Sequence, residues 1–524
     1  MESKRLSLFV VMLVIVSIAT LIFAVFCSSQ PLNNDAAILL WAAEQLLDGR
    51  TPYVDYVELA LPAAHYVHTF PVLVSRLLEL PLPLIFQGCV FILVIITAAL
   101  LYIFSEQLRD ATDPKCEASS QCFLASWFIF SLYVFADGGF GQREHLFILT
   151  YLPFLICRVA KHLAIQIPGE LCLVAGLLLA PFALIKPHFM VLLLCSEFWL
   201  LFRSRSYASL KQIEMIAIFT VVILYLLHFA FIPSNMRHAF FTNFLPFVIQ
   251  NYTVYNCSWH DLLFTSVNSL VIPLLFTALC CIVWSYRRNV PAALLCEVLG
   301  VSSIAGGVLF IVQHKGWSYH LYPALGCFTL LLATLFAMTY QDKRQLRMTA
   351  FSTWVVAALL LSTLGLGFIA FDLGKGRMLR LMPLISYLKQ NSASDESILF
   401  ISTNVYPAFP AILYADRRMT GRYGQMFPIP FFYSAREKVQ SGVPPYRNRS
   451  NWSSEERAFL EQLGLDIQRD RPALVFIDAS TCRACPPDFV VAEYLMKSGW
   501  GDEFLSAYHE VGRVERFLVF GRSS

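Results

Sequence analysis

The sequence predicts a polytopic α-helical membrane protein that ends in a small α/β domain. Of its 524 residues, 57% are hydrophobic and 14% are charged, and the mean hydropathy is +0.60, which is outside the range of soluble globular proteins. Long apolar runs recur as far as residue 371. The net charge of +3 is small and the basic residues form short, scattered clusters, a pattern that argues against a nucleic-acid partner.

About eleven apolar runs are long enough to cross a hydrocarbon core of about 30 Å as helices. They cover residues 7–27, 83–104, 121–137, 145–160, 170–186, 188–203, 212–233, 262–285, 291–312, 320–340 and 349–371. The first run follows MESKR and is longer than the apolar part of a signal peptide, and no A-x-A cleavage site comes after it. We therefore expect an uncleaved first span.

The distribution of Lys and Arg predicts the orientation, because cytoplasmic loops carry an excess of both. With MESKR inside, the segments RVAKH, RSRSYASLK, SYRRN and QDKRQLR all fall in cytoplasmic loops. An odd number of spans then places the C-terminus outside. We expect a transmembrane domain over residues 1–374 and an extracytoplasmic domain over residues 375–524.

The C-terminal part alternates short β-like runs with polar helical ones. SILFIST, RPALVFID and ERFLVFG predict strands, and SSEERAFLEQLG predicts a helix, which together favour an α/β fold. Cys482 and Cys485 in TCRACPP have the spacing of a local disulfide or of half a metal site. Because the sequence has no second CxxC and no nearby His pair, a disulfide or two free thiols is the favoured interpretation.

The first predicted outer loop, residues 28–82, is long and carries several acidic residues. Between Asp35 and Asp48 the apolar residues recur at helical spacing, which predicts a helix lying along the membrane surface. The apolar face consists of Ile38, Leu39, Trp41, Ala42, Leu46 and Leu47. Asp35 lies at the N-terminus of this helix, where the alternative role for it or for Asn34 is that of a helix cap.

Three polar clusters fall at predicted outer helix ends, against the usual charge bias. They lie in GGFGQREH, IKPH and VQHKGWSYH and contribute Arg143, Glu144, His145, Lys186, His188, His314, Lys315 and His320. The first outer loop adds Asp35, Asp55 and Glu58. Charges at membrane depth are costly and usually mark a binding site or a transport path. The structural alternatives are a local ion pair between Arg143 and Glu144, and hydrogen-bonded interface histidines.

This set of side chains suits an anionic lipid phosphate. The guanidinium of Arg143 can bind two phosphate oxygens at once, whereas Lys186 and Lys315 act as point charges. The carboxylates of the first outer loop remain available for proton transfer.

The stretch GRTPYVDYVELALPAAHYVHTFPVLVSRLL, preceded by a first span and by an acidic residue that opens a helix, resembles the first outer loop of the GT-C glycosyltransferases. The resemblance is to bacterial members akin to the protein mannosyltransferases and the aminoarabinose transferase of lipid A. It extends through QREH, KPH and HKGWSYH, to about residue 340. Asp35 takes the place of the first acidic residue of the family and Glu58 that of the second. The sequence departs from the family pattern at Ala36, where a second acid is usual, and at residues 59–62, where LALP replaces Lys/Asn-Pro-Pro.

The resemblance implies a GT-C-like fold and a glycosyltransferase of the bacterial inner membrane. The implied donor is a sugar on a polyprenyl phosphate or diphosphate, and the acceptor is a glycan, a lipid or a protein at the outer face. Asp35 would act as general base, and Glu58 would orient a sugar or share a metal with Asp35. Arg143, Lys186 and Lys315 would hold the phosphate. The further candidates for substrate contacts are Asp55, Glu144, His145, His188, His314 and His320. Inversion at the anomeric carbon is implied by the family, and Mg²⁺, Mn²⁺ and metal-free catalysis all stay open.

Two other functions would use similar polar residues. A transporter or flippase for a lipid-linked sugar would guide the phosphate with cations, but such proteins often have paired halves and broken helices near the midplane, and the charges here lie at helix ends. An O-antigen-type polymerase or ligase would depend on a large later outer loop, and the segment 234–261 keeps that alternative open.

Overall fold

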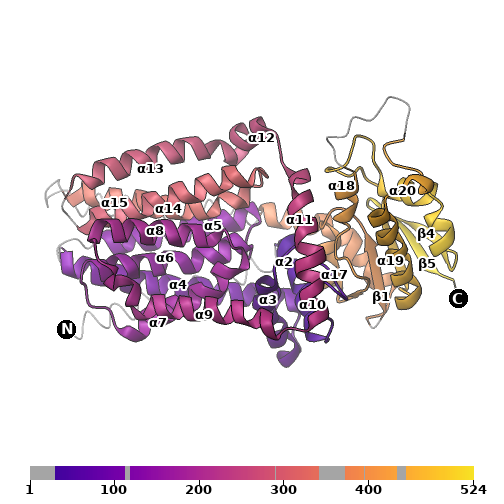
Figure 1. Ribbon diagram of the computed structural model, residues 1–524, viewed down its shortest axis with the longest axis horizontal. Coiled ribbons are helices and arrows are strands. Elements are labelled where there is room, and N and C mark those ends of the chain that lie inside the picture. Colours follow the sequence, from indigo (N-terminus) through magenta and orange to yellow (C-terminus); the bar gives the residue numbers. More distant parts are fainter. Residues whose placement is uncertain are drawn as a thin grey trace. The chain divides into compact units, whose positions relative to one another are not determined.

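The computed structural model describes residues 30–112, 118–288, 291–341, 372–394, 396–433 and 444–523 (Figure 1). The chain divides into two compact units that are interleaved in sequence. The helical unit comprises Met1–Pro31, Phe86–Leu227 and Cys257–Arg377. The mixed unit comprises Leu32–Ile85, His228–Asn256 and Met378–Ser524.

A helix forms at each of the nine spans that the sequence predicts between residues 83 and 340. The helices are α4 (Leu82–Thr112), α5 (Ala118–Asp137), α6 (Arg143–His162), α7 (Gly169–Ile185), α8 (Phe189–Ser204), α9 (Ile213–Phe231), α13 (Val271–Tyr286), α14 (Pro291–Gln313) and α15 (Tyr322–Gln341). Figure 1 shows them as a bundle of long helices that run side by side. Short elements connect them, namely η1 (Tyr207–Lys211), α12 (Trp259–Phe264), η4 (Ser266–Leu270) and η5 (Ser318–Leu321).

Five segments of the described chain are long and apolar enough to cross a membrane. They are Leu82–Leu108, Ile213–Phe231, Ser266–Tyr286, Ala292–Gln313 and Ser318–Leu335. The predicted polytopic helical fold is therefore confirmed. The spans predicted at 7–27 and 349–371 lie outside the described residues, so the total of eleven stays a prediction.

Helix α6 lies at the centre of the helical unit. All of its side chains from Glu144 to Ala160 are buried, and Phe147 stacks on Tyr151 and on Phe189 with ring centroids 5.1 and 4.4 Å apart. Such a helix cannot be amphipathic in the usual sense, because it has no solvent-facing stripe. Its few charged residues must therefore find partners inside the protein.

The mixed unit is built around a five-stranded sheet with the order β2-β1-β3-β5-β4. The strands are β1 (Ser397–Ile401), β2 (Arg418–Met419), β3 (Leu474–Asp478), β4 (Tyr508–Val514) and β5 (Phe517–Arg522). Strand β1 is parallel to β2 and β3, whereas β5 pairs antiparallel with both β3 and β4. The three strands predicted from SILFIST, RPALVFID and ERFLVFG are thus confirmed, as β1, β3 and β5.

Helices cover this sheet and complete the α/β domain. They are α17 (Ala408–Ala415), α18 (Pro428–Phe432), η6 (Arg449–Asn451), α19 (Ser454–Asp470), α20 (Val491–Lys497) and α21 (Trp500–Phe504). Leu460 and Leu463 of α19 join Val475 and Ile477 of β3 in one buried core, which confirms the helix predicted from SSEERAFLEQLG. Cys482 and Cys485 form a disulfide, one of the two favoured interpretations of that motif. Residues 372–391 form a further helix.

The first predicted outer loop belongs to the mixed unit and forms two helices, α2 (Asn34–Leu47) and α3 (Pro62–Leu78). Helix α2 packs against α3 and α17. Its residues from Ala36 to Ala43 are all buried, so the protein covers every side of this part of the helix and not just the predicted apolar face. The unit is completed by α10 (Ser234–His238), η2 (Ala239–Phe244), α11 (Leu245–Asn251) and η3 (Tyr252–Tyr255).

Candidate active site

The helical unit gathers a buried carboxylate, a lysine and a histidine at one end of its bundle. Glu144, in the first turn of α6, is 1% exposed and accepts a hydrogen bond from the ammonium of Lys186, which follows α7. The ring atom Nε2 of His320, in η5, lies 3.5 Å from the same carboxylate oxygen. We call Glu144, Lys186 and His320 the Glu144 cluster. It joins one residue from each of the three polar segments that the sequence places at the same side.

The turn before α6 depends on the glycines of GGFGQREH. Gly141 has a φ of +78°, and a Cβ at this position would lie 2.5 Å from the ring of Phe86, so only glycine fits there. The backbone N–H of Gly141 donates to Nδ1 of His145 at 3.2 Å. The turn thereby fixes the start of α6 and, with it, the position of Glu144.

Three cationic side chains influence His320. The positive charges of Lys186, Arg143 and Lys315 all act on its ring electrostatically, and Lys315 is 7% exposed. Glu144 forms an ion pair with Lys186, which is a contact between the start of α6 and the residue that follows α7.

Several buried polar atoms at this end make no hydrogen bond within the described residues. They are Oε2 of Glu144, Nε2 of His145, Nε2 of His188 and Nδ1 of His320. Buried polar groups are nearly always satisfied, so a group of unsatisfied ones indicates a place for water or a ligand. His314 differs, because its ring packs edge-on against Trp259 at 4.4 Å.

In the mixed unit, Asp35 is the second residue of α2. The helix is capped by Asn33, whose side-chain oxygen accepts the backbone N–H of Asp35 at 2.9 Å. The alternative that Asp35 or Asn34 caps this helix is therefore wrong. The carboxylate of Asp35 accepts a hydrogen bond from the Asn34 side chain at 3.1 Å, and the residue is partly exposed.

Glu58 is buried and is 8% exposed. Its Oε2 lies 3.8 Å from Nε2 of the fully buried His65, and neither atom has a hydrogen-bond partner in the described chain. Nδ1 of His65 lies 3.4 Å from the Tyr56 hydroxyl, and the ring of Tyr53 stacks on the His65 ring. His65 was not among the residues predicted from the sequence, although it follows Glu58 by seven positions in the loop that resembles the family.

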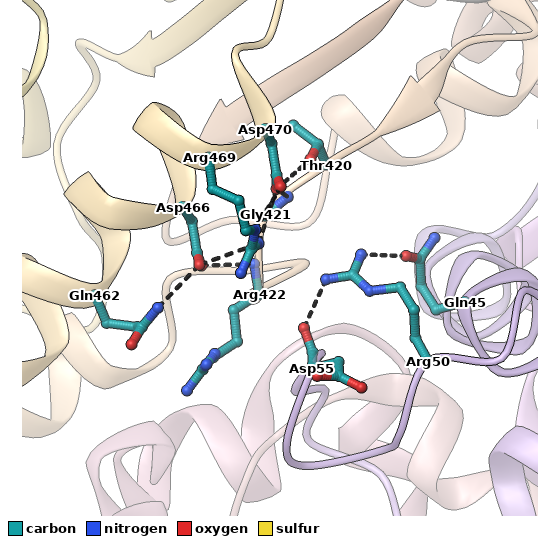
Figure 2. Close-up of polar contacts among 10 residues, drawn as sticks. All are labelled: Gln45, Arg50, Asp55, Thr420, Gly421, Arg422, Gln462, Asp466, Arg469 and Asp470. Carbon is teal, nitrogen blue, oxygen red and sulfur yellow. Dashed lines mark hydrogen bonds and ion pairs between the residues drawn. The ribbon is translucent and has the colours of Figure 1, made fainter.

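Asp55 has a local structural role. Its carboxylate accepts the backbone N–H of Thr51 at 2.8 Å, and its carbonyl accepts a guanidinium N–H of Arg50 at 2.7 Å (Figure 2). The second bond of Arg50 goes to Gln45 at the end of α2. These contacts hold the turn between α2 and Glu58.

No group of three or more His, Cys, Asp or Glu side chains in the described parts of the chain is arranged to hold a metal ion. The structure thus gives neither Asp35 nor Glu58 a ready-made set of further ligands.

A second buried ionic group lies near the other end of α6 and was not predicted from the sequence. Arg158 is fully buried and binds both carboxylate oxygens of Glu197 at 2.7 Å and one of Glu214 at 2.6 Å. The sequence placed RVAKH in a cytoplasmic loop, but α6 continues to His162. Arg158 therefore points into the bundle, where it links α6, α8 and α9.

No protein-family model matches the chain, and no curated protein matches it. Solved structures do match. ArnT from Cupriavidus metallidurans bound to undecaprenyl phosphate is 12% identical with a TM-score of 0.54, and the match covers 97% of each chain. The apo state of the same ArnT is 12% identical with a TM-score of 0.55, covering 99% of this chain and 98% of that one. At this identity the likeness shows the fold alone, and it confirms the GT-C-like fold that the sequence resemblance implied.

Proposed function

We propose that this protein is an integral membrane glycosyltransferase that moves a sugar from a polyprenyl-phosphate donor to an acceptor hydroxyl. The observation that carries the proposal is the Glu144 cluster with its neighbouring cations, in a chain that shares its fold over nearly its whole length with an ArnT bound to undecaprenyl phosphate. A phosphate is what Arg143, Lys186 and Lys315 would bind best.

In the proposed reaction, Asp35 accepts the proton of the acceptor hydroxyl. The hydroxyl oxygen forms a bond to the anomeric carbon of the donor sugar from the side opposite the phosphate. The bond between that carbon and the phosphate oxygen breaks, its electron pair stays on the oxygen, and the product is a polyprenyl phosphate. Arg143, Lys186 and Lys315 stabilise the charge that grows on this oxygen. Attack from the opposite side inverts the configuration at the anomeric carbon.

Glu58 is proposed to orient a sugar through its buried carboxylate. The acceptor is a glycan, a lipid or a protein at the outer face of a bacterial inner membrane, with the N-terminus in the cytoplasm. The proposal does not require a metal, because phosphate is already a good leaving group once cations neutralise it.

Replacing Asp35 with Asn tests the role of the general base. We expect Asp35→Asn to lower kcat by about 10²- to 10⁴-fold, the usual worth of a general base, in transfer from radiolabelled polyprenyl-phosphate sugars by membranes with matched expression. Asp48→Asn is the control, because Asp48 follows the other end of α2 and is exposed. Equal activity of Asp35→Asn and the native protein would mean that another group accepts the proton.

Replacing Lys186 with Met tests phosphate binding. We expect Lys186→Met to raise the KM for the lipid-linked donor by about tenfold or more, because a charge-assisted contact to phosphate is lost. The double variant Lys186→Met/Glu144→Gln removes the buried charge that the single variant leaves unpaired. If the double variant regained the native KM, Lys186 would serve only to neutralise Glu144, and the assignment to phosphate would be wrong.

A further inference from the structure

Two carboxylates at the end of α19 hold a short segment of the mixed unit. Oδ2 of Asp470 accepts the hydroxyl of Thr420 at 2.5 Å and the backbone N–H of Gly421 at 3.2 Å. Oδ2 of Asp466 accepts the backbone N–H of Arg422 at 3.1 Å. Figure 2 shows both carboxylates directed at this segment from the same helix. We call residues 419–424 the bridging segment.

The two carboxylates are themselves held in place. Arg469 donates to Asp470 at 2.6 Å and lies 3.2 Å from Asp466, and Gln462 donates to Asp466 at 3.0 Å. Burial raises the pKa of Asp470, but the hydrogen bonds from Arg469 and Thr420 outweigh it and leave this pKa below its usual value. The carboxylate of Asp470 is therefore an ionised acceptor at neutral pH, which makes its hydrogen bonds stronger than neutral ones.

The opposite side of the bridging segment contacts the residue before Glu58. The carbonyl of Arg422 accepts the backbone N–H of Val57 at 2.7 Å, and Val57 pairs in parallel with Tyr423. The position of the Glu58 backbone is thus tied to a segment that α19 anchors.

The same segment contacts the helix that carries Asp35. The carbonyl of Met419 accepts the indole N–H of Trp41 at 3.3 Å. A Cβ at Gly424 would lie 2.6 Å from the Trp41 ring and 3.0 Å from Ile38, so the backbone of Gly424 lies directly against α2. Through Met419 and Gly424 the bridging segment contacts α2, and through Arg422 and Tyr423 it contacts the residue before Glu58.

We propose that Asp466 and Asp470 are positioning residues for the glycosyl transfer, acting through the bridging segment on Glu58 and on helix α2. The inference rests on the proposed function, because it assigns the C-terminal domain a task in that reaction. The C-terminal domain then fixes the positions of Asp35 and Glu58 in the first outer loop, and it does so without touching the substrate.

A displacement of about 1 Å at a reacting group can cost about 10²-fold in rate. We therefore expect Asp470→Ala to lower kcat by about 10- to 100-fold while the KM of the donor changes by less than about threefold. Asp470→Asn should recover most of the rate, because its amide oxygen accepts the same two hydrogen bonds. Glu461→Gln is the control, since Glu461 is exposed on the same helix and the charge change is the same as in Asp470→Asn.

A double-mutant cycle separates positioning from folding. If Asp470 acts by placing Glu58, then Asp470→Ala should cause little further loss in a Glu58→Gln background, whereas independent effects would multiply. Thr420→Val removes one hydrogen bond only and provides a milder variant if Asp470→Ala folds poorly, with Thr420→Ser as its rescue. Full multiplication of the losses, or native kcat in both Asp470→Ala and Thr420→Val, would overturn the inference.

Hydrogen exchange of the Val57 amide gives a readout that does not depend on activity. We expect exchange at this amide to speed up in Asp470→Ala and to stay unchanged in Glu461→Gln, because the bond to Arg422 opens more often when the segment is released. Native protein without any transfer activity would contradict the proposed function, while unchanged exchange in an active Asp470→Ala protein would contradict the positioning role alone.

Discussion

Oε2 of Glu58 and Nε2 of His65 lie 3.8 Å apart in the mixed unit, and neither atom makes a hydrogen bond within the described part of the chain. This distance is too long for a direct hydrogen bond, and a hydroxyl or a water in contact with both would satisfy them. In a glycosyltransferase we expect a sugar hydroxyl to take that place, so that His65 and Glu58 orient the sugar together.

Replacing His65 tests whether this side chain orients the sugar. His65→Asn should lower kcat by about 10²-fold, because the orienting group is lost while the site stays polar. The control is His68→Asn, because His68 is buried on the same helix and bonds the carbonyl of Ala64. Equal losses in the two variants, measured by transfer at saturating donor, would point to the packing of α3 instead of a contact with the sugar.

The carboxyl group of Glu44 makes the stability of the protein depend on pH. Its burial on α2 raises the pKa of its carboxyl to about 7, with Arg76 lowering it in part. The unfolded chain ionises this group near pH 4.5, so the native state loses stability as the pH rises from there to about 7. Glu44→Gln removes this loss.

We therefore expect the Tm of Glu44→Gln to exceed that of the native protein by a margin that grows between pH 5 and pH 8, measured in the same detergent. Glu79→Gln, which alters an exposed carboxyl after α3, should show no such trend. A constant difference between Glu44→Gln and the native protein across this range would contradict the raised pKa.

At the scale of elements, the buried group around Arg158 ties three helices together. Removing one partner from a buried ion pair leaves charge without compensation and typically costs about 3–5 kcal/mol. Arg158→Met leaves Glu197 and Glu214 facing each other, so we expect a loss of stability of that order in denaturant or thermal unfolding. Arg205→Met alters an exposed arginine after α8 and should change stability by less than about 0.5 kcal/mol. Similar behaviour of the two variants would mean that the buried group adds little.

The elements themselves were largely predictable, because a hydrophobic run of membrane length or an alternating β pattern is a local property of the sequence. Nine helices and three strands lie where those patterns placed them. The local sequence does not show in which direction a charged side chain points. Arg158 looks like an ordinary cytoplasmic charge in RVAKH, yet its helix extends past it and turns it inward. The cap of α2 was misplaced by one to two residues, since Asn33, Asn34 and Asp35 are all good capping residues and only the backbone decides among them.

At the scale of the whole molecule, the division into two interleaved units follows from contacts between distant parts of the sequence. Trp41 donates to the carbonyl of Met419, 378 positions away, and no periodicity in either segment predicts this. The Glu144 cluster was easier to predict, because alternate ends of consecutive helices meet at one end of a bundle. Asp466 and Asp470 were not predictable as important, since two of their three bonds to the bridging segment come from backbone N–H groups, which every residue except proline has.

The central claim is that the protein breaks the bond between a sugar and a polyprenyl phosphate. The most direct test is to incubate the purified full-length protein in liposomes with a radiolabelled polyprenyl-phosphate sugar and membrane-derived acceptors, and to measure free polyprenyl phosphate together with labelled product. We expect both to appear in equal amounts, and we expect Asp35→Asn to form both about 10²- to 10⁴-fold more slowly. Donor that stays intact while the native protein moves it from one leaflet to the other would contradict the account and identify a transporter.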